Sequence, residues 1–556
     1  MNCLAAVLLL LMATLIGNTS GRCGGGGGKW ELFLNSSGVV AMHMALTHRN
    51  TVVMLDQTRA GPSGRCLRDR CPSCNRSDPS CWAHSVEYDL HCGGIRPLTL
   101  DTDTWCSSGS FLGDGTLLQT GGHGDGARRA RYFRPCRPGG GCDWEEPEEQ
   151  VLADGRWYAS NQVLPEGDRA VVVGGRGSYS YEFVPPSHGG RRLLELPFLE
   201  KTRRREEGRA NLYPFLHLST DGNLFVFANR DSILLDYRSH RVVRAFPRMP
   251  GRGSRSNPNT ASSVLLPLDH ADGFRKAEVM ICGGAHAGAY QAVKSSPRRF
   301  LRALSSCGRM VIAGNAEEPR WAMEDMPGPR VMSDMLVLPS GDVLLINGAT
   351  RGCSGWGRAR RPAYRPYLYK PTGRPHRRFS VLKPSTVARM YHSSAIVIPD
   401  GRVLVAGSNP NSHYVFAGVP HPTELRVEAF SPPYMTESFT SRRATNLTLN
   451  DQLIGGGGGV KYGAEFGVRF LPPRRFRSEE VEFHAYAPPF ATHSLSMNQR
   501  LLKLGWGGVA AEKGGWVHAV VVAPPSPEVA PTGYYLLSVV NAGVPSEAIW
   551  MRFVFA

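Results

Sequence analysis

The stretch from Arg389 to Pro410, RMYHSSAIVIPDGRVLVAGSNP, contains one complete unit of the pattern that decides the fold. Its first apolar run, AIVI, is followed by an Asp-Gly pair and a second apolar run, VLVA. Two short apolar strands separated by Asp-Gly are typical of a tight β-hairpin. Tyr391 and His392 stand at the start of the first strand, so a phenol and an imidazole that could face one metal ion lie side by side.

The same unit recurs along the chain at intervals of roughly 50 to 65 residues, which is the spacing of kelch-type β-propeller repeats. A four-stranded blade cannot bury both of its faces alone, so successive blades must stack around an axis. We expect an all-β protein with a seven-bladed propeller over residues 30–423, its ring closed by strands from both ends of that segment. Further copies end at Gly122, Gly175, Arg230, Gly284 and Gly348, and MHMALTHRNTVVMLD supplies a less regular seventh.

A different pattern begins after residue 423. Short strands that alternate polar and apolar residues replace the hairpin repeat, as in GYYLLSVVNAGVPSEAIWMRFVFA at the end of the chain. Such alternation is typical of β-sandwiches. The sequence therefore predicts a second, immunoglobulin-like domain over residues 424–556.

The N-terminal residues 1–22 have the pattern of a signal peptide. The uncharged apolar run Leu4–Ile16 is followed by small and polar residues, and it is too short to span a membrane. No later segment is apolar for long enough to cross a bilayer. We therefore expect a secreted protein without a membrane span.

Cysteines and glycosylation triplets agree with export. The chain has 13 cysteines and three Asn-x-Ser/Thr triplets, at Asn35, Asn75 and Asn446, which we expect to be glycosylated. The dense cysteine block from Cys66 to Cys92 contains one CxxC pair and no second, so we expect disulfides there rather than a zinc site. Cys282 and Cys307, inside one predicted blade, form the first disulfide that we expect.

The formal net charge of +17 is carried mostly by arginine. Secretion and the lack of a nucleic-acid-binding motif argue against a nucleic-acid partner. A basic surface could bind an acidic extracellular polysaccharide, and it could equally be a solvated face without a partner.

Residues at equivalent places in different blades meet at the axis of a propeller, although they lie far apart in sequence. Three such places hold unusual residues, Trp105-Cys106, Trp157-Tyr158 and Tyr391-His392. The second domain adds His493, in the loop PPFATHS. Each residue alone is more often structural: a cysteine in a disulfide, a strand tyrosine with a satisfied hydroxyl, or a loop histidine. Their joint occurrence favours a metal site.

With these residues the chain resembles the galactose oxidase and glyoxal oxidase family of copper radical oxidases, most closely the plant glyoxal oxidase-like (aldehyde oxidase) proteins. The resemblance covers nearly the whole mature chain and implies a kelch propeller followed by an early-set sandwich. It implies one copper ion, a thioether bond between Tyr158 and Cys106, Tyr391 as the axial ligand and His392 and His493 as imidazole ligands. Tyr158 would be both a metal ligand and the site of a tyrosyl radical.

This set of residues suits a two-electron oxidation. Imidazoles and phenolates are good ligands for Cu(II), and an open position would admit substrate. Copper moves one electron, so a tyrosyl radical on Tyr158 would supply the second oxidising equivalent. Tyr391 would take a proton from the substrate as general base, and O2 would be reduced to hydrogen peroxide.

The family resemblance also guides the choice of substrate. Galactose oxidases have a tryptophan soon after the Gly-Gly of the blade with the cross-linked tyrosine, whereas here Gly174-Gly175 is followed by Arg176, Gly177 and Ser178. Tyr179 or Tyr181 is the candidate substitute. The sugar-binding residues have no counterpart, which favours simple aldehydes such as glyoxal and methylglyoxal.

We expect a monomeric, secreted aldehyde oxidase of the extracellular space and cell wall (apoplast) that uses O2. A basic surface could keep it near acidic wall polysaccharide. One alternative keeps the copper site and makes the substrate a primary alcohol or carbohydrate. The other is a non-catalytic kelch propeller that binds the cell wall.

Overall fold

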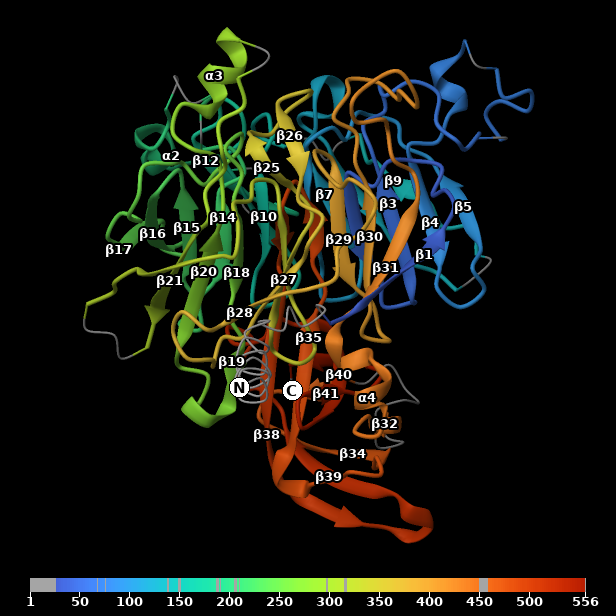
Figure 1. Cartoon of the computed structure of the whole chain (residues 1–556), viewed down its shortest axis with the longest axis vertical. Coiled ribbons are helices and arrows are strands. Elements are labelled where there is room, and N and C mark those ends of the chain that lie inside the picture. The colour runs from blue at the N-terminus through green and yellow to red at the C-terminus, as the bar shows by residue number, and fades with distance from the viewer. Residues whose placement is uncertain are drawn as a thin grey trace, which may run out of the picture.

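The computed structural model describes residues 27–67, 69–75, 77–137, 140–148, 152–186, 190, 192–204, 208–209, 211–296, 299–314, 318–449 and 459–555. Seven antiparallel sheets surround a central axis, and the C-terminal part of the chain lies against one face of the ring (Figure 1). The predicted seven-bladed propeller is confirmed. The predicted signal peptide lies outside the described residues.

The first four blades run from the innermost strand outward in chain order. The first contains β2 (His43–Leu46), β3 (Thr51–Leu55), β4 (Ser85–Asp89) and β5 (Ile95–Leu98). The second contains β6 (Ser108–Phe111), β7 (Leu117–Thr120), β8 (Ala130–Phe133) and β9 (Trp144–Glu145). The third contains β10 (Ser160–Val163), β11 (Ala170–Val173), β12 (Ser180–Val184) and β13 (Leu194–Glu195). The fourth contains β14 (Phe215–Leu218), β15 (Leu224–Ala228), β16 (Asp231–Asp236) and β17 (Arg241–Ala245).

The last three blades complete the ring. The fifth contains β18 (Ser262–Leu265), β20 (Ala277–Cys282), β21 (Ser306–Ala313) and β22 (Ala322–Asp325). The sixth contains β23 (Asp334–Val337), β24 (Val343–Ile346), β27 (Tyr367–Tyr369) and β28 (Phe379–Val381). The seventh contains β29 (Ser393–Val397), β30 (Val403–Gly407), β31 (Val427–Ser431) and β1 (Lys29–Leu34). Since β1 from the N-terminal side pairs with β31, the seventh blade contains strands from both ends of the propeller segment.

The hairpin β29–β30 shows why the repeat folds as it does. Ser393 pairs with Gly407 and Val397 with Val403, so the Asp-Gly pair lies in the turn. Gly401 in that turn has φ +91°, a left-handed conformation that glycine adopts without steric cost. All residues of both strands are buried, because neighbouring blades cover both faces of the sheet. Burial of each large apolar side chain contributes about 1.5–3 kcal/mol.

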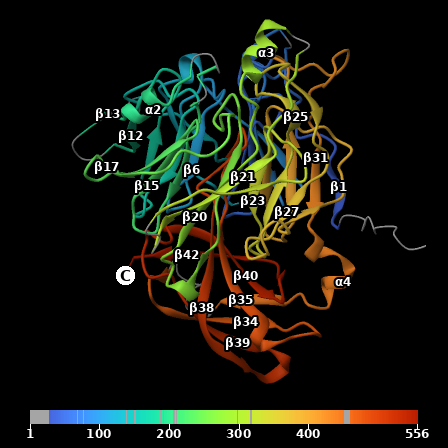
Figure 2. The same ribbon diagram turned by 60° about the vertical axis from the view of Figure 1, so that its left-hand side comes forward.

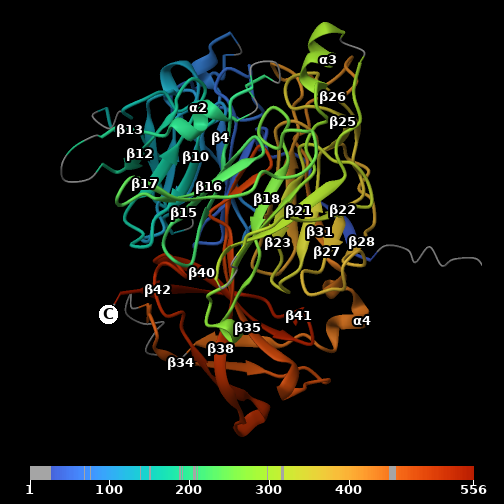
Figure 3. The ribbon, with the colours of Figure 1, turned by 90° about the vertical axis from the view of Figure 1, so that its left-hand side faces the viewer.

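The C-terminal domain is built on one large curled sheet, as predicted for a sandwich domain (Figures 2 and 3). It contains β32 (Thr445–Leu449), β33 (Val460–Lys461), β34 (Glu465–Leu471), β35 (Val481–Ala487), β38 (Arg500–Ala511), β39 (Val517–Val522), β40 (Gly533–Asn541), β41 (Val544–Pro545) and β42 (Ile549–Val554). The short β19 (Leu268–Asp269) of the propeller pairs in parallel with β38 and joins the two domains.

One hairpin of this domain leaves it and enters the propeller. Its strands are β36 (Phe490–Thr492) and β37 (Leu495–Met497). β36 pairs with β2, the innermost strand of the first blade, so the hairpin lies at the axis. In Figures 2 and 3 a red segment of the C-terminal part runs up into the middle of the ring. The second domain thereby contributes residues to the axial site.

The α-helices in the described ranges are short. They are α2 (Pro197–Lys201), α3 (Ala289–Ser295) and α4 (Glu437–Thr440). A two-stranded ribbon, β25 (Ala349–Gly352) and β26 (Ala359–Pro362), projects from the sixth blade near α3 at the end of the propeller opposite the C-terminal domain (Figure 1). Within the described ranges, no helix has the length and hydropathy needed to cross a membrane.

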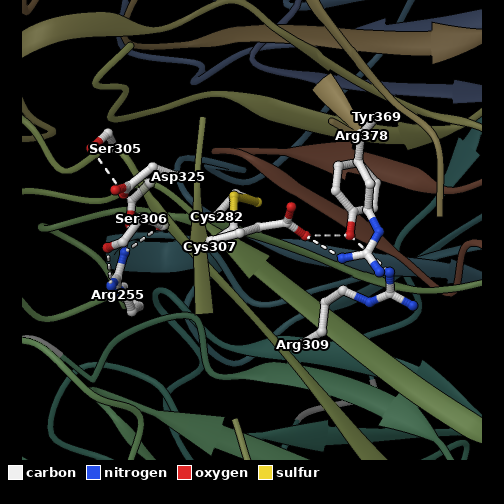
Figure 4. Close-up of a disulfide and its surroundings, with 11 residues drawn as sticks. Arg255, Cys282, Ser305, Ser306, Cys307, Arg309, Asp325, Tyr369 and Arg378 are labelled. Carbon is white, nitrogen blue, oxygen red and sulfur yellow. Dashed lines mark hydrogen bonds and ion pairs between the residues drawn. A yellow bond between two sulfur atoms is a disulfide. The ribbon is translucent and has the colours of Figure 1, made fainter. Parts of the chain in front are cut away.

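The disulfides follow the sequence prediction. Cys282 and Cys307 are direct cross-strand partners on β20 and β21 and are bonded, as expected (Figure 4). The dense N-terminal block forms two bonds, and a further pair closes the loop after β8. These three are Cys66–Cys74, Cys71–Cys81 and Cys136–Cys142. The free cysteines of the described part are Cys92, Cys106 and Cys353.

Candidate metal centre

Five blades place a residue with a left-handed backbone one or two positions before their innermost strand. We call these the mouth residues: Cys106, Tyr158, Tyr213, Met332 and His392, with φ between 51° and 66°. Non-glycine residues seldom adopt this conformation, and each costs about 1–3 kcal/mol that the surrounding structure must offset. The repetition of one backbone geometry brings chemically different side chains to the same axial level.

Backbone hydrogen bonds tie three adjacent mouths together. The amide of Tyr158 donates to the carbonyl of Cys106 (2.9 Å), and the amide of Tyr213 donates to the carbonyl of Tyr158 (2.9 Å). Cys106 and Tyr158 are therefore held as direct neighbours, although 51 positions separate them in the sequence. This proximity is what a covalent bond between their side chains would require.

The hairpin from the C-terminal domain brings His493 to the same place. His493 and Ser494 form its tip, with φ of 44° and 72°. The hydroxyl of Ser262, on the innermost strand of the fifth blade, donates to the carbonyl of Ser494 (2.7 Å) and fixes the tip. Thr492 holds the ring orientation, because its Oγ1 lies 2.7 Å from Nδ1 of His493.

The potential ligand atoms converge. One ligand atom from each of Cys106, His392 and His493 lies within 4.8 Å of the other two. The hydroxyls of Tyr158 and Tyr391 are 3.3 Å apart, and Sγ of Cys106 is 3.3 Å from Nε2 of His493. The structure thus brings together all five site residues that the sequence predicted.

The site is almost dry. The five residues are between 0 and 8% exposed. Burial raises the pKa of Tyr158 and Tyr391 well above the usual value, and each is raised further by the charge of the other or of Cys106. Burial lowers the pKa of His392 to about 3, and that of His493 falls well below its usual value. Both imidazoles are therefore neutral at physiological pH and can donate a lone pair to a metal.

The thiol of Cys106 is also affected. Burial raises its pKa well above the usual value, and the neighbouring hydroxyls of Tyr158 and Tyr391 partly oppose this effect. The backbone hydrogen bond between the two residues places the thiol beside Tyr158. At neutral pH the free thiol keeps its proton and is a poor nucleophile.

The residues fit a copper ion. Neither ring nitrogen of the buried His392 has a hydrogen-bond partner among the described residues, which is unfavourable for a polar group unless something else binds it. Two imidazoles and two phenols suit Cu(II). A narrow cavity of about 10 Å³ adjoins His392, His493 and Tyr391 and is also lined by Asn257 and Ser354.

Tyr213 is a site residue that the sequence analysis missed. Its hydroxyl donates to the carbonyl of Ser107 (2.8 Å) and lies 3.4 Å from Nδ1 of His493. A proton on Nδ1 would leave Nε2 free to bind metal, so Tyr213 and Thr492 can select the ligating tautomer. The signal was present, because Tyr213 precedes the first strand of its blade as Cys106 and Tyr158 precede theirs.

The candidate substitutes for the missing tryptophan lie elsewhere. The hydroxyl of Tyr179 accepts a hydrogen bond from Arg203, and that of Tyr181 lies 2.9 Å from Nδ1 of His240. Both tyrosines lie on the third blade away from its mouth, in or beside β12, so this expectation is wrong. The indole that contacts Tyr158 is that of Trp157, with ring centroids 5.0 Å apart.

Comparisons with known proteins agree with the fold and show the family. A family model described as the glyoxal oxidase N-terminus matches residues 42–434, and one described as the galactose oxidase-like early set domain matches residues 448–553. The chain is 44% identical over 536 residues to aldehyde oxidase GLOX of Vitis pseudoreticulata, covering 95% of this chain and 97% of that protein. It is 43% identical over 543 residues to aldehyde oxidase GLOX1 of Arabidopsis thaliana, covering 95% and 85%.

A solved structure shares the architecture. A fungal alcohol oxidase of the AA5 family, in complex with copper, superposes with a TM-score of 0.71. The superposition covers 95% of this chain and 100% of the other, at 18% sequence identity. At that identity the likeness concerns the fold alone.

Proposed function

Because the chain belongs to the glyoxal oxidase family, we propose that it is a copper radical oxidase that converts small aldehydes to carboxylic acids and O2 to hydrogen peroxide. The observation that carries the proposal is the convergence of two tyrosines, two histidines and a buried free cysteine on one axial point. In the overall reaction RCHO, H2O and O2 give RCOOH and H2O2.

The protein's own residues have distinct roles. Tyr158, Tyr391, His392 and His493 would hold the ion, one copper per chain. Bound copper would supply one of the two electron-accepting centres that a two-electron oxidation needs. Tyr158, joined to Cys106 by a thioether, would supply the other as a tyrosyl radical. Tyr391 would accept the substrate's hydroxyl proton, since a raised pKa makes its phenolate a strong base.

The space beside the ligands favours small substrates. Its cavity volume of about 10 Å³ has room for about one water molecule and is far below the roughly 300–1,000 Å³ of common small-molecule sites. Asn257 and Ser354 offer hydrogen bonds to an aldehyde hydrate. A primary alcohol, particularly one on a carbohydrate, is the competing substrate class.

Activity measurements on copper-loaded protein test the proposal. We expect glyoxal and methylglyoxal to give acid and peroxide in equal amounts, with O2 consumed one for one, and kcat/KM for galactose to be lower. An equal or higher kcat/KM for galactose would favour the alternative that the substrate is a primary alcohol on a carbohydrate. If copper binds and neither class is oxidised, the chain is a binding protein and the proposal fails.

We further propose that the protein is exported to the cell wall space. Four disulfides in the described part of the chain support an oxidising compartment. The side chains of Asn35, Asn75 and Asn446 are exposed, so all three are accessible to glycosylation. Retention on acidic polysaccharide by basic surface charge would be lost in salt, which a wall-binding assay at increasing ionic strength measures.

A further inference from the structure

A row of aromatic rings connects the buried centre with the surface. The ring of Trp157 contacts that of Tyr158 (5.0 Å between centroids), and Trp105 contacts Trp157 (5.0 Å). Trp356 stacks on Trp105 with centroids 4.8 Å apart and ring planes 5° from parallel. Trp356 is 39% exposed, whereas Tyr158 is 8% exposed.

The outer end of the row comes from another part of the ring. Trp356 lies in the turn between β25 and β26, and this ribbon belongs to the sixth blade, while Trp105 precedes the second. The turn is anchored by the amide of Gly357, which donates to the carbonyl of Pro410 (2.8 Å). The stack therefore extends across the mouth of the propeller. The second blade holds Trp105, and the turn of the sixth blade holds Trp356.

The row matters because the centre is closed to bulky reagents. The side chains proposed to bind copper are at most 8% exposed, so a large one-electron oxidant cannot touch them. Rings in van der Waals contact pass electrons readily. We propose that Trp356, Trp105 and Trp157 form a relay through which an external one-electron oxidant removes an electron from Tyr158. This inference rests on the proposed function of Tyr158 as a tyrosyl radical.

The electron count is simple. The oxidant takes one electron from Trp356, the vacancy is filled in turn from Trp105 and Trp157, and the last electron leaves Tyr158. As a metal ligand Tyr158 carries no hydroxyl proton, so no proton has to move. The oxidant is an outer-sphere complex such as hexacyanoferrate(III), which becomes hexacyanoferrate(II).

Two local features suit this role. The guanidinium of Arg176 lies 4.8 Å from the ring centroid of Trp157 and disfavours a resting positive charge there, so Trp157 acts as a bridge. The buried Nε1 of Trp105 has no hydrogen-bond partner among the described residues. A radical cation on Trp105 consequently has no acceptor for its proton, so the oxidation of Trp105 stays reversible.

Hexacyanoferrate(III) tests the relay without turnover. Cross-linked protein that holds Cu(II) and unoxidised Tyr158, obtained by reducing only the radical, is mixed with it in the absence of O2 and aldehyde. Bleaching of the oxidant and the radical spectrum are followed by stopped flow. We expect one equivalent to be consumed, about tenfold more slowly in Trp356→Phe and Trp105→Phe, a difference of about 1.4 kcal/mol in the barrier.

Matched variants separate the relay from other roles. Trp356→Tyr, which keeps an oxidisable ring, should recover most of the rate, and Trp516→Phe in the distant C-terminal domain should match the unmodified protein. Unchanged rates in both phenylalanine variants would overturn the relay, as would an altered KM for aldehyde with an unchanged oxidation rate. If the unmodified protein itself takes up no oxidising equivalent, the radical function fails instead.

Discussion

Two sides of the propeller axis share a backbone and differ in chemistry. Blades two, three, four and seven place Cys106, Tyr158, Tyr213 and His392 at their mouths, whereas the sixth blade places Met332 in the same left-handed conformation. The cost of that conformation is thus part of the fold and not specific to the reactive residues. The repeat supplies positions, and side-chain identity at a few of them supplies the site.

The largest effect is expected where the reactive side loses its sulfur. Cys106→Ser removes the thioether, so we expect kcat/KM for glyoxal to fall at least about a thousandfold, or about 4 kcal/mol. Cys353 is also buried and free but is not a mouth residue, so Cys353→Ser should keep its activity. Oxidase rates at equal copper content measure both. Near-normal rates in Cys106→Ser would show that the reaction does not need the sulfur of Cys106.

An intermediate effect is expected for Tyr213→Phe. The variant loses the hydroxyl that bonds to Ser107 and faces Nδ1 of His493, and partners of metal ligands usually affect metal affinity or activity about 10–100-fold. Copper affinity and kcat are the measurements. Met332→Leu changes the equivalent mouth of the sixth blade, which borders the same space with an apolar side chain, and we expect less than about a threefold change. Equal losses in both variants would show a general packing effect.

The variant expected to change activity least concerns stability, in the sixth blade. Burial raises the pKa of Asp334 in β23 from 3.8 to about 7. Between these pH values the native state holds a proton that the unfolded state has lost, so this group lowers the unfolding free energy as pH rises, by at most about 1.4 kcal/mol per pH unit. Above pH 7 the contribution is flat.

The variant Asp334→Asn isolates the contribution of this carboxyl group to the pH dependence of the unfolding free energy. Asparagine has no proton to lose, so the difference between the two proteins should change with pH from 5 to 7 and become constant by pH 8. Urea unfolding at each pH measures it, and buried histidines act alike in both proteins and cancel. A difference that is constant throughout would mean that Asp334 is ionised in the native state.

The sequence predicted what local patterns determine. Apolar pairs of strands around Asp-Gly or another short turn predicted seven hairpins at a roughly regular spacing, and the cross-strand pair Cys282–Cys307 followed from its place in one blade. The ligand set was predictable through a family resemblance, since the five residues carry weak signals singly. The backbone bonds that hold Cys106 beside Tyr158 depend on packing between blades, and no local pattern encodes them.

Long-range contacts account for what was missed. Tyr213 was overlooked because the aromatic residue before β14 resembles any strand tyrosine until the other mouths are aligned with it. The prediction that Tyr179 or Tyr181 replaces a stacking indole was wrong, because the indole that contacts Tyr158 is that of Trp157. The contact between Trp105 and Trp356 joins opposite blades and follows from ring closure alone.

The central claim is that the neighbouring mouths of the second and third blades form a tyrosine–cysteine cofactor. Peptide mass analysis of copper-loaded, air-exposed protein tests it most directly. We predict a Cys106 peptide joined to a Tyr158 peptide with loss of two hydrogens and resistance to thiol reductants. A free Cys106 thiol, or a bond that reductants cleave, would contradict it.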